Sequence, residues 1–139
     1  MRFFTLKEMT ATSTKIKNFP ETWEEMKNLE RLTLFLDKVR FALGKPIRVN
    51  SGFRSPYVNV AVKGSPMSAH LDGLAADIEA WSGVEADNRR ICAIIESIGG
   101  YDQLLVYHEK SSIASSKIRF IHVSLPEEEM TPRNQLIHL

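Results

Sequence analysis

The most regular hydrophobic pattern in this sequence lies between residues 26 and 43. Its apolar positions recur at steps of three and four: Met26, Leu29, Leu32, Phe35, Leu36, Val39 and Leu43. This spacing predicts an amphipathic helix with one buried face. Thr22 and Glu25 have the spacing of a capping box and predict where the helix starts, while Gly44 and Pro46 predict where it ends. We interpret this helix as scaffold.

Shorter patterns predict the remaining elements. Thr5 and Glu8 form another capping box, which predicts a short helix, and residues 57–62 and 84–98 have helical character. Strands are predicted at 47–49, 74–79, 101–107 and 118–125. Residues 10–19 are interpreted as loop, and the tail after Pro126 yields no structural prediction. The order of elements predicts an α+β fold, with a small antiparallel sheet flanked by helices, in a single domain covering residues 1–139.

Composition narrows the classes of function. The chain has 139 residues and a formal net charge of +1, which gives no indication of binding to nucleic acid or to an anionic membrane. No apolar stretch is long enough to cross a membrane. Lys7 and Glu8 stand where a signal peptide needs its apolar run, so we expect synthesis in the cytoplasm without a signal peptide. The single cysteine, Cys92, excludes an internal disulfide and is interpreted as a buried apolar residue.

Two histidines and one aspartate carry the candidate chemistry. His70 lies in a turn-prone segment, Asp77 in a predicted strand seven residues later, and His122 in the last predicted strand. Because side chains alternate along a strand, His122 should point away from a core face that contains Ile121 and Val123. Asp77 needs a partner, since an unpaired buried carboxylate is costly, and that partner could be a metal, an arginine or a helix N-terminus. Imidazole and carboxylate are preferred zinc ligands, and three protein ligands leave one position open, so we predict one zinc ion.

These residues lie within a longer set of motifs. The sequence reads SGFRSP at 51–56, has Asn59, and then reads SAHLDGLAAD at 68–77, YDQL at 101–104 and FIHVS at 120–124. Together the motifs resemble the zinc D-alanyl-D-alanine carboxypeptidase family, which includes bacterial and phage peptidoglycan peptidases of the hedgehog/DD-peptidase fold. The resemblance covers nearly the whole chain, from Phe4 to about Leu125, and it implies a hedgehog/DD-peptidase-like arrangement of the α+β fold.

The resemblance also implies roles for individual positions. The three matches to the zinc ligands are His70, Asp77 and His122. Arg54 matches an arginine that contacts the substrate or stabilises the developing oxyanion. Ser68 and Gln103 match positions close to the site, and we expect them to contact substrate.

The general base is where the chain departs from the family pattern. Many relatives carry an acidic residue three positions before the last histidine ligand, where this chain has Arg119. Close relatives instead carry a glutamate after the Asp-Gln-Leu strand, and that count falls here on Tyr107. Glu109, two residues further on, is our candidate base, and His108 is the alternative because an imidazole can do the same work. If both are ordinary solvated loop residues, the enzyme is expected to be slow or inactive.

We therefore predict a zinc metallopeptidase that cuts a D-amino-acid-containing bond in the stem peptide of bacterial peptidoglycan. It would be either carboxypeptidase-like or an endopeptidase, and we expect a monomer that binds no nucleic acid. Lacking a signal peptide, it would reach the cell wall only after release, as a phage lysin does. The alternative is a non-catalytic cell-wall or phage-particle binding module on the same fold. A structural protein without metal fits the composition but leaves Asp77 unexplained.

Overall fold

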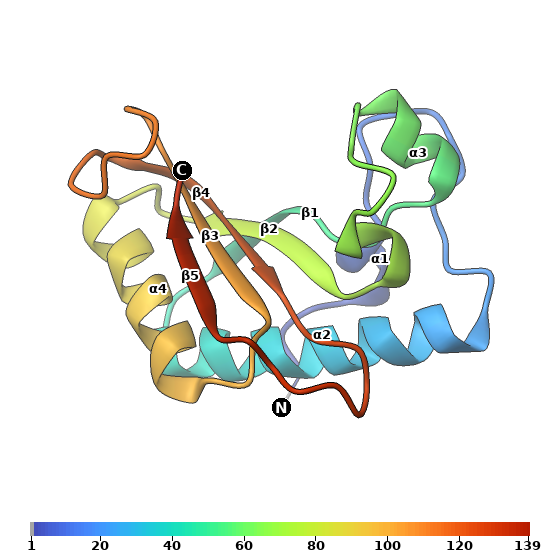
Figure 1. Ribbon diagram of the computed structural model, residues 1–139, viewed down its shortest axis with the longest axis horizontal. Helices are drawn as coiled ribbons and strands as arrows, with labels where there is room; N and C mark the ends of the chain where they lie inside the picture. The colour runs from blue at the N-terminus through green and yellow to red at the C-terminus, as the bar shows by residue number, and fades with distance from the viewer. Residues whose placement is uncertain (1) are drawn as a thin grey trace.

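The computed structural model describes residues 2–139, which begin with two helices and end with three consecutive strands (Figure 1). The elements are α1 (Leu6–Met9), α2 (Trp23–Leu43), β1 (Ile47–Ser51), α3 (Pro56–Ala61), the 3₁₀ helix η1 (Ala69–Asp72), β2 (Ala75–Ala80), α4 (Glu85–Ile98), β3 (Gln103–His108), β4 (Ile118–Ser124) and β5 (Gln135–His138). Every helix and strand expected from the sequence is present, with small shifts at the ends. The structure adds η1 and β5, neither of which the sequence predicted.

The five strands form one sheet in the order β1-β2-β4-β3-β5. The pairs β1–β2, β2–β4 and β3–β4 are antiparallel, while β3–β5 is parallel. The expected antiparallel sheet is therefore confirmed with one exception at its edge. β5 covers the edge of β3 that the hairpin would otherwise leave open (Figure 1).

The two long helices pack against one face of this sheet. The shared core joins apolar side chains of α2 and α4 to those of the central strands, with the largest fully buried members including Leu32, Leu36, Ile78, Ile91, Ile95, Leu104 and Ile121. Both predicted capping boxes are formed, at Thr5 with Glu8 and at Thr22 with Glu25. Gly44 ends α2 in the left-handed conformation that favours glycine.

The opposite face of the central strands carries the polar side chains. Along β4, Ile121 and Val123 are fully buried in the core, while His122 between them is half-buried on the other side. Along β2, Ala76 and Ile78 face the core and Asp77 faces away. The prediction that His122 points away from the core is confirmed, and Asp77 emerges on the same face.

None of the helices formed by residues 2–139 is both long and apolar enough to cross a membrane.

Candidate metal centre

Register across three strands places the candidate ligands in one row. Asp77 on β2 lies opposite His122 on β4 and, on its other side, opposite Ser51 on β1. A bulge between Val49 and Ser51 shifts the β1 register so that Ser51 reaches this row. The sheet therefore aligns a hydroxyl, a carboxylate and an imidazole side by side.

His70 comes from η1 rather than from the sheet. Ser68 caps this 3₁₀ turn, its hydroxyl accepting from the His70 amide at 3.2 Å. Gly73 ends the turn at φ +77°, and a Cβ there would lie 2.8 Å from the Glu25 carbonyl oxygen of α2. η1 is therefore packed tightly onto the long helix, which fixes the place from which the His70 side chain extends.

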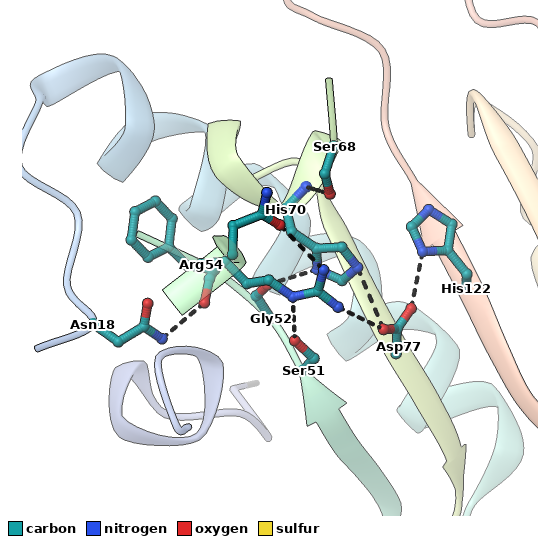
Figure 2. Close-up of polar contacts among 10 residues, drawn as sticks. Asn18, Ser51, Gly52, Arg54, Ser68, His70, Asp77 and His122 are labelled. Atoms are coloured by element: carbon teal, nitrogen blue, oxygen red, sulfur yellow. Dashed lines mark hydrogen bonds and ion pairs between the residues drawn. The ribbon is translucent and has the colours of Figure 1, made fainter. Parts of the chain in front are cut away.

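The three predicted ligands converge, with Asp77 between the two imidazoles (Figure 2). His122 Nδ1 lies 2.9 Å from Asp77 Oδ1, and His70 Nε2 lies 3.4 Å from Asp77 Oδ2. One ligand atom from each residue lies within 4.8 Å of the other two. The His70 side chain is only 3% exposed, whereas those of Asp77 and His122 are 15% and 14% exposed. The cluster could therefore hold a metal ion that remains accessible from one side.

The hydrogen bond on the far side of the His70 ring indicates a cation. His70 Nδ1 lies 2.7 Å from the Gly52 carbonyl oxygen, which can only accept, so Nδ1 carries the hydrogen. In the neutral ring, Nε2 then presents a lone pair to the carboxylate of Asp77. Two lone pairs repel unless a proton or a metal ion lies between them. Metal-binding histidines commonly donate their other N–H to a carbonyl, so this donor set fits zinc.

Asp77 is ionised in this environment. Burial on its own would raise the pKa of the Asp77 carboxyl, but the His122 and His70 rings outweigh it when they are protonated, through their hydrogen bonds and their positive charge. The net effect holds the pKa far below the ordinary value of 3.8. A carboxyl group binds a metal ion in its ionised form, so Asp77 is available as a ligand near neutral pH.

Arg54 borders the cluster and is held by three acceptors (Figure 2). Its guanidinium donates to Ser51 Oγ at 3.0 Å, to Asn59 Oδ1 at 3.4 Å and to Asp77 Oδ2 at 3.3 Å. Its backbone amide donates to the His70 carbonyl oxygen at 3.0 Å. The structure therefore brings Arg54 next to Asp77 and His70.

The two predicted substrate contacts are both engaged within the protein. Ser68 caps η1 as described above. Gln103 pairs with Ser124 at the start of β3, and its side-chain amide donates to Gln135 Oε1 of β5 at 2.8 Å. Both residues therefore have a structural role in addition to the substrate contact that we expect.

The structure does not bring the two candidate bases to the cluster. His108 is 3% exposed on the core face of β3, where Nδ1 donates to the Ser116 carbonyl oxygen and Nε2 lies 2.7 Å from His138 Nδ1. This placement argues against His108 as the alternative base, because its ring lies on the opposite face of the sheet from His122. Glu109 is exposed just beyond β3. Since Leu105 lies opposite His122, Glu109 is roughly 13 Å further along an extended chain.

Sequence reasoning missed several residues that hold the site together. Asn18 was interpreted only as part of a loop, yet its carboxamide bonds the backbone beside Arg54. Asn59 was quoted as part of a motif without a role, but it is buried and accepts from Arg54. Gly52 supplies the carbonyl that orients His70. The SGFRSP motif and the nearby Asn59 could have signalled the roles of Gly52 and Asn59. The contacts of Asn18 could not be foreseen, because they join segments 35 to 37 positions apart.

Comparison with known proteins identifies a family. A protein-family model described as Peptidase M15 matches residues 2–124. The matched segment contains His70, Asp77, His122 and Arg54, and it ends before β5. A search of the curated proteins finds no match.

Proposed function

Because the chain belongs to the Peptidase M15 family of zinc-dependent peptidases, we propose that it hydrolyses a D-amino-acid-containing bond in the stem peptide of bacterial peptidoglycan. The observation that carries this proposal is the convergence of His70, Asp77 and His122 within 4.8 Å. We propose these three as the zinc ligands within one peptidase domain formed by residues 1–139.

Zinc bound by these residues would supply a Lewis acid that polarises the scissile carbonyl and activates water for attack. The protein's own contribution is to fix the ligands. Gly52 holds the His70 ring in one orientation, and the β2–β4 register holds Asp77 against His122. Arg54, with one edge of its guanidinium on Asp77, is proposed to stabilise the oxyanion or the substrate carboxylate, which its planar fork suits.

For proton transfer we propose Glu109 in preference to His108. Both ring nitrogens of His108 are engaged, whereas the Glu109 side chain is exposed to solvent. A general base must reach its proton directly or through one water, so Glu109 would have to approach the cluster when substrate binds. Tyr107 lies nearer on the same strand, but its phenol is a poor base at neutral pH.

A second candidate is a non-catalytic module that binds the cell wall or a phage particle. The observation that favours it is the aromatic row beside the cluster, where Tyr107 stacks on Phe120 at 4.4 Å and no carboxylate is supplied by β3 or β4. In that case zinc would be structural.

The test combines metal analysis with product analysis on purified protein. We expect one zinc per chain and cleavage of peptidoglycan fragments that stops on chelation. His122→Ala should lose both, while His138→Ala, the same change away from the cluster, should retain both. Release of free D-alanine would identify a carboxypeptidase, and opening of crosslinked dimers an endopeptidase. Zinc-bound protein without turnover would support the binding module, and absence of stoichiometric zinc would remove the peptidase proposal.

Action on the bacterial wall requires release of the protein from the cytoplasm in which it is synthesised. We propose that a membrane-permeabilising partner supplies that release, as for a phage lysin. Lysis of bacteria that co-express the chain with such a partner, and not of bacteria that express His122→Ala, would support this route.

A further inference from the structure

One side chain outside the cluster bonds the backbone on both sides of Arg54. Asn18 donates through Nδ2 to the Phe53 carbonyl oxygen at 2.9 Å and accepts through Oδ1 from the Ser55 amide at 2.7 Å. These groups belong to the peptide units immediately before and after Arg54. Figure 2 shows Asn18 beside this segment, on the side away from Asp77.

Asn18 is itself fixed at the end of a long loop. Its Nδ2 also donates to the Thr10 carbonyl oxygen at 2.8 Å, and the Ser55 hydroxyl donates to the Lys17 carbonyl oxygen at 3.1 Å. The loop between α1 and α2 therefore closes over the start of α3, beside which it runs in Figure 1. The end of this loop is therefore attached to the Arg54 segment through Lys17 and Asn18.

The chemistry of the carboxamide explains why asparagine stands here. One short planar group must donate to a carbonyl and accept from an amide a few ångströms away, and asparagine offers both. Aspartate only accepts, and alanine offers neither. Together with the bond from the Arg54 amide to the His70 carbonyl oxygen, Asn18 fixes the backbone from which the guanidinium extends.

We propose that Asn18 is a positioning residue for Arg54, and that the loop 10–18 belongs to the frame of the active site. The catalytic part of this inference rests on the proposed function, because it requires Arg54 to act on substrate. The structural part, that Asn18 fixes the backbone of Arg54, does not depend on the proposed function. A displacement of about 1 Å at a group that acts in the transition state can cost roughly 100-fold in rate.

The first measurement follows Arg54 directly and needs no turnover. The Nε–H of Arg54, which donates to Ser51 Oγ, can be followed by hydrogen exchange in ¹⁵N NMR spectra. We expect Asn18→Ala to accelerate this exchange at least tenfold. The control is Asn88→Ala, which removes a buried asparagine that accepts from the Ala80 amide far from Arg54, and should leave the exchange unchanged.

The second measurement is a double-mutant cycle on kcat/KM. Asn18→Ala should lower kcat/KM by about 10- to 100-fold, with zinc content unchanged. The loss should fall on the same parameter, kcat or KM, that Arg54→Ala changes. Asn18→Asp keeps the acceptor for the Ser55 amide but sets a carboxylate oxygen against the Thr10 and Phe53 carbonyl oxygens, so it should lose at least as much as Asn18→Ala. In an Arg54→Ala background, Asn18→Ala should cause little further loss, because its effect passes through Arg54.

The outcomes separate the two proposals. Unchanged Arg54 exchange in Asn18→Ala overturns the positioning role, and so does a fully additive loss of activity in the cycle. If the wild-type protein shows no turnover, the proposed function fails while the exchange experiment still decides the role of Asn18. If Asn18→Ala does not fold, Asn18→Ser, which keeps a small polar side chain, is used in the same exchange comparison.

Discussion

His122 and Asp77 face each other across the pairing of β2 with β4, with His122 Nδ1 2.9 Å from Asp77 Oδ1. The two residues are 45 positions apart in the chain. An ion bound to both would therefore tie together strands that have no local connection, and such an ion binds the folded state alone. Metal affinity and folding stability are coupled at this contact.

Zinc should consequently raise the unfolding temperature. With free zinc at 100 times its dissociation constant, the free energy of unfolding should increase by about 2.7 kcal/mol. His122→Ala or Asp77→Ala should lose most of this increase, and His138→Ala should retain it. Thermal unfolding with zinc and with chelator measures the difference. Equal zinc stabilisation of wild type and His122→Ala would show that the ion binds elsewhere.

Gly52→Ala should damage both stability and metal binding. A Cβ at residue 52 would lie 2.4 Å from the Met9 carbonyl oxygen, so backbone must move, and the Gly52 carbonyl that orients His70 moves with it. We expect a loss of about 1–3 kcal/mol in unfolding free energy together with weaker zinc binding. Denaturant unfolding and zinc titration test the two effects.

Gly44→Ala is the matched control for that substitution. Its φ of +72° strains an alanine, but nothing lies within 4 Å of its Cβ and it is remote from His70. It should lower stability while zinc affinity stays at the wild-type value. Weaker zinc binding in Gly44→Ala would mean that loss of stability alone explains the Gly52 result.

Acidification should destabilise the fold through His138. Burial lowers the pKa of the His138 ring below its ordinary value of 6.5, the neighbouring His108 and Arg89 lower it further, and Glu96 acts in the opposite direction. The unfolded chain then takes up a proton as pH falls through about 6.5 while the folded chain takes it up only at lower pH, so stability is lost on acidification.

The comparison that isolates this effect is wild type against His138→Asn, both in chelator. The pH dependence of the unfolding free energy between pH 7.5 and 5 should be shallower in the variant. Parallel curves would show that His138 titrates equally in the folded and unfolded states.

Tyr107→Glu should increase turnover. Tyr107 lies opposite Phe120, two register positions along the sheet from the pair formed by Leu105 and His122, so a carboxylate there would be closer to the cluster than Glu109. A well-placed base contributes typically 10²–10⁴-fold, and we expect at least a tenfold rise in kcat. Tyr107→Gln, of similar size without the charge, is the control. A gain shared by both variants, or by neither, would count against a missing base.

Much of the fold follows from local pattern. The spacing of apolar residues in α2 and the two capping boxes depend only on near neighbours, so they could be predicted from the sequence. β5 could not, because Leu136 and Ile137 are too few to mark a strand in a polar tail. The strand forms because the open edge of β3 supplies its hydrogen bonds, and that edge is set by segments far away in the sequence.

The candidate site likewise contains features that could be predicted from the sequence and features that could not. Alternation along β4 predicted which way His122 points, and the motifs singled out His70, Asp77 and Arg54. The placement of His108 could not be predicted, because a bulge between Tyr107 and His108 and the partner His138 on β5 determine where its ring lies. The role of Asn18 depends on a contact between residues 35 to 37 positions apart, which no local pattern encodes.

The alternation along β4 also constrains how this scaffold could be altered. Ile121 and Val123 have no contact with solvent, and their burial decides on which face of the sheet His122 lies. A shift of the β4 register by one residue would put an alkyl side chain in place of the imidazole. Few substitutions within this strand could therefore change which cation or substrate is bound. The segments that carry Arg54 and His70 lie outside the ladder, so a substitution there leaves the strand register unchanged.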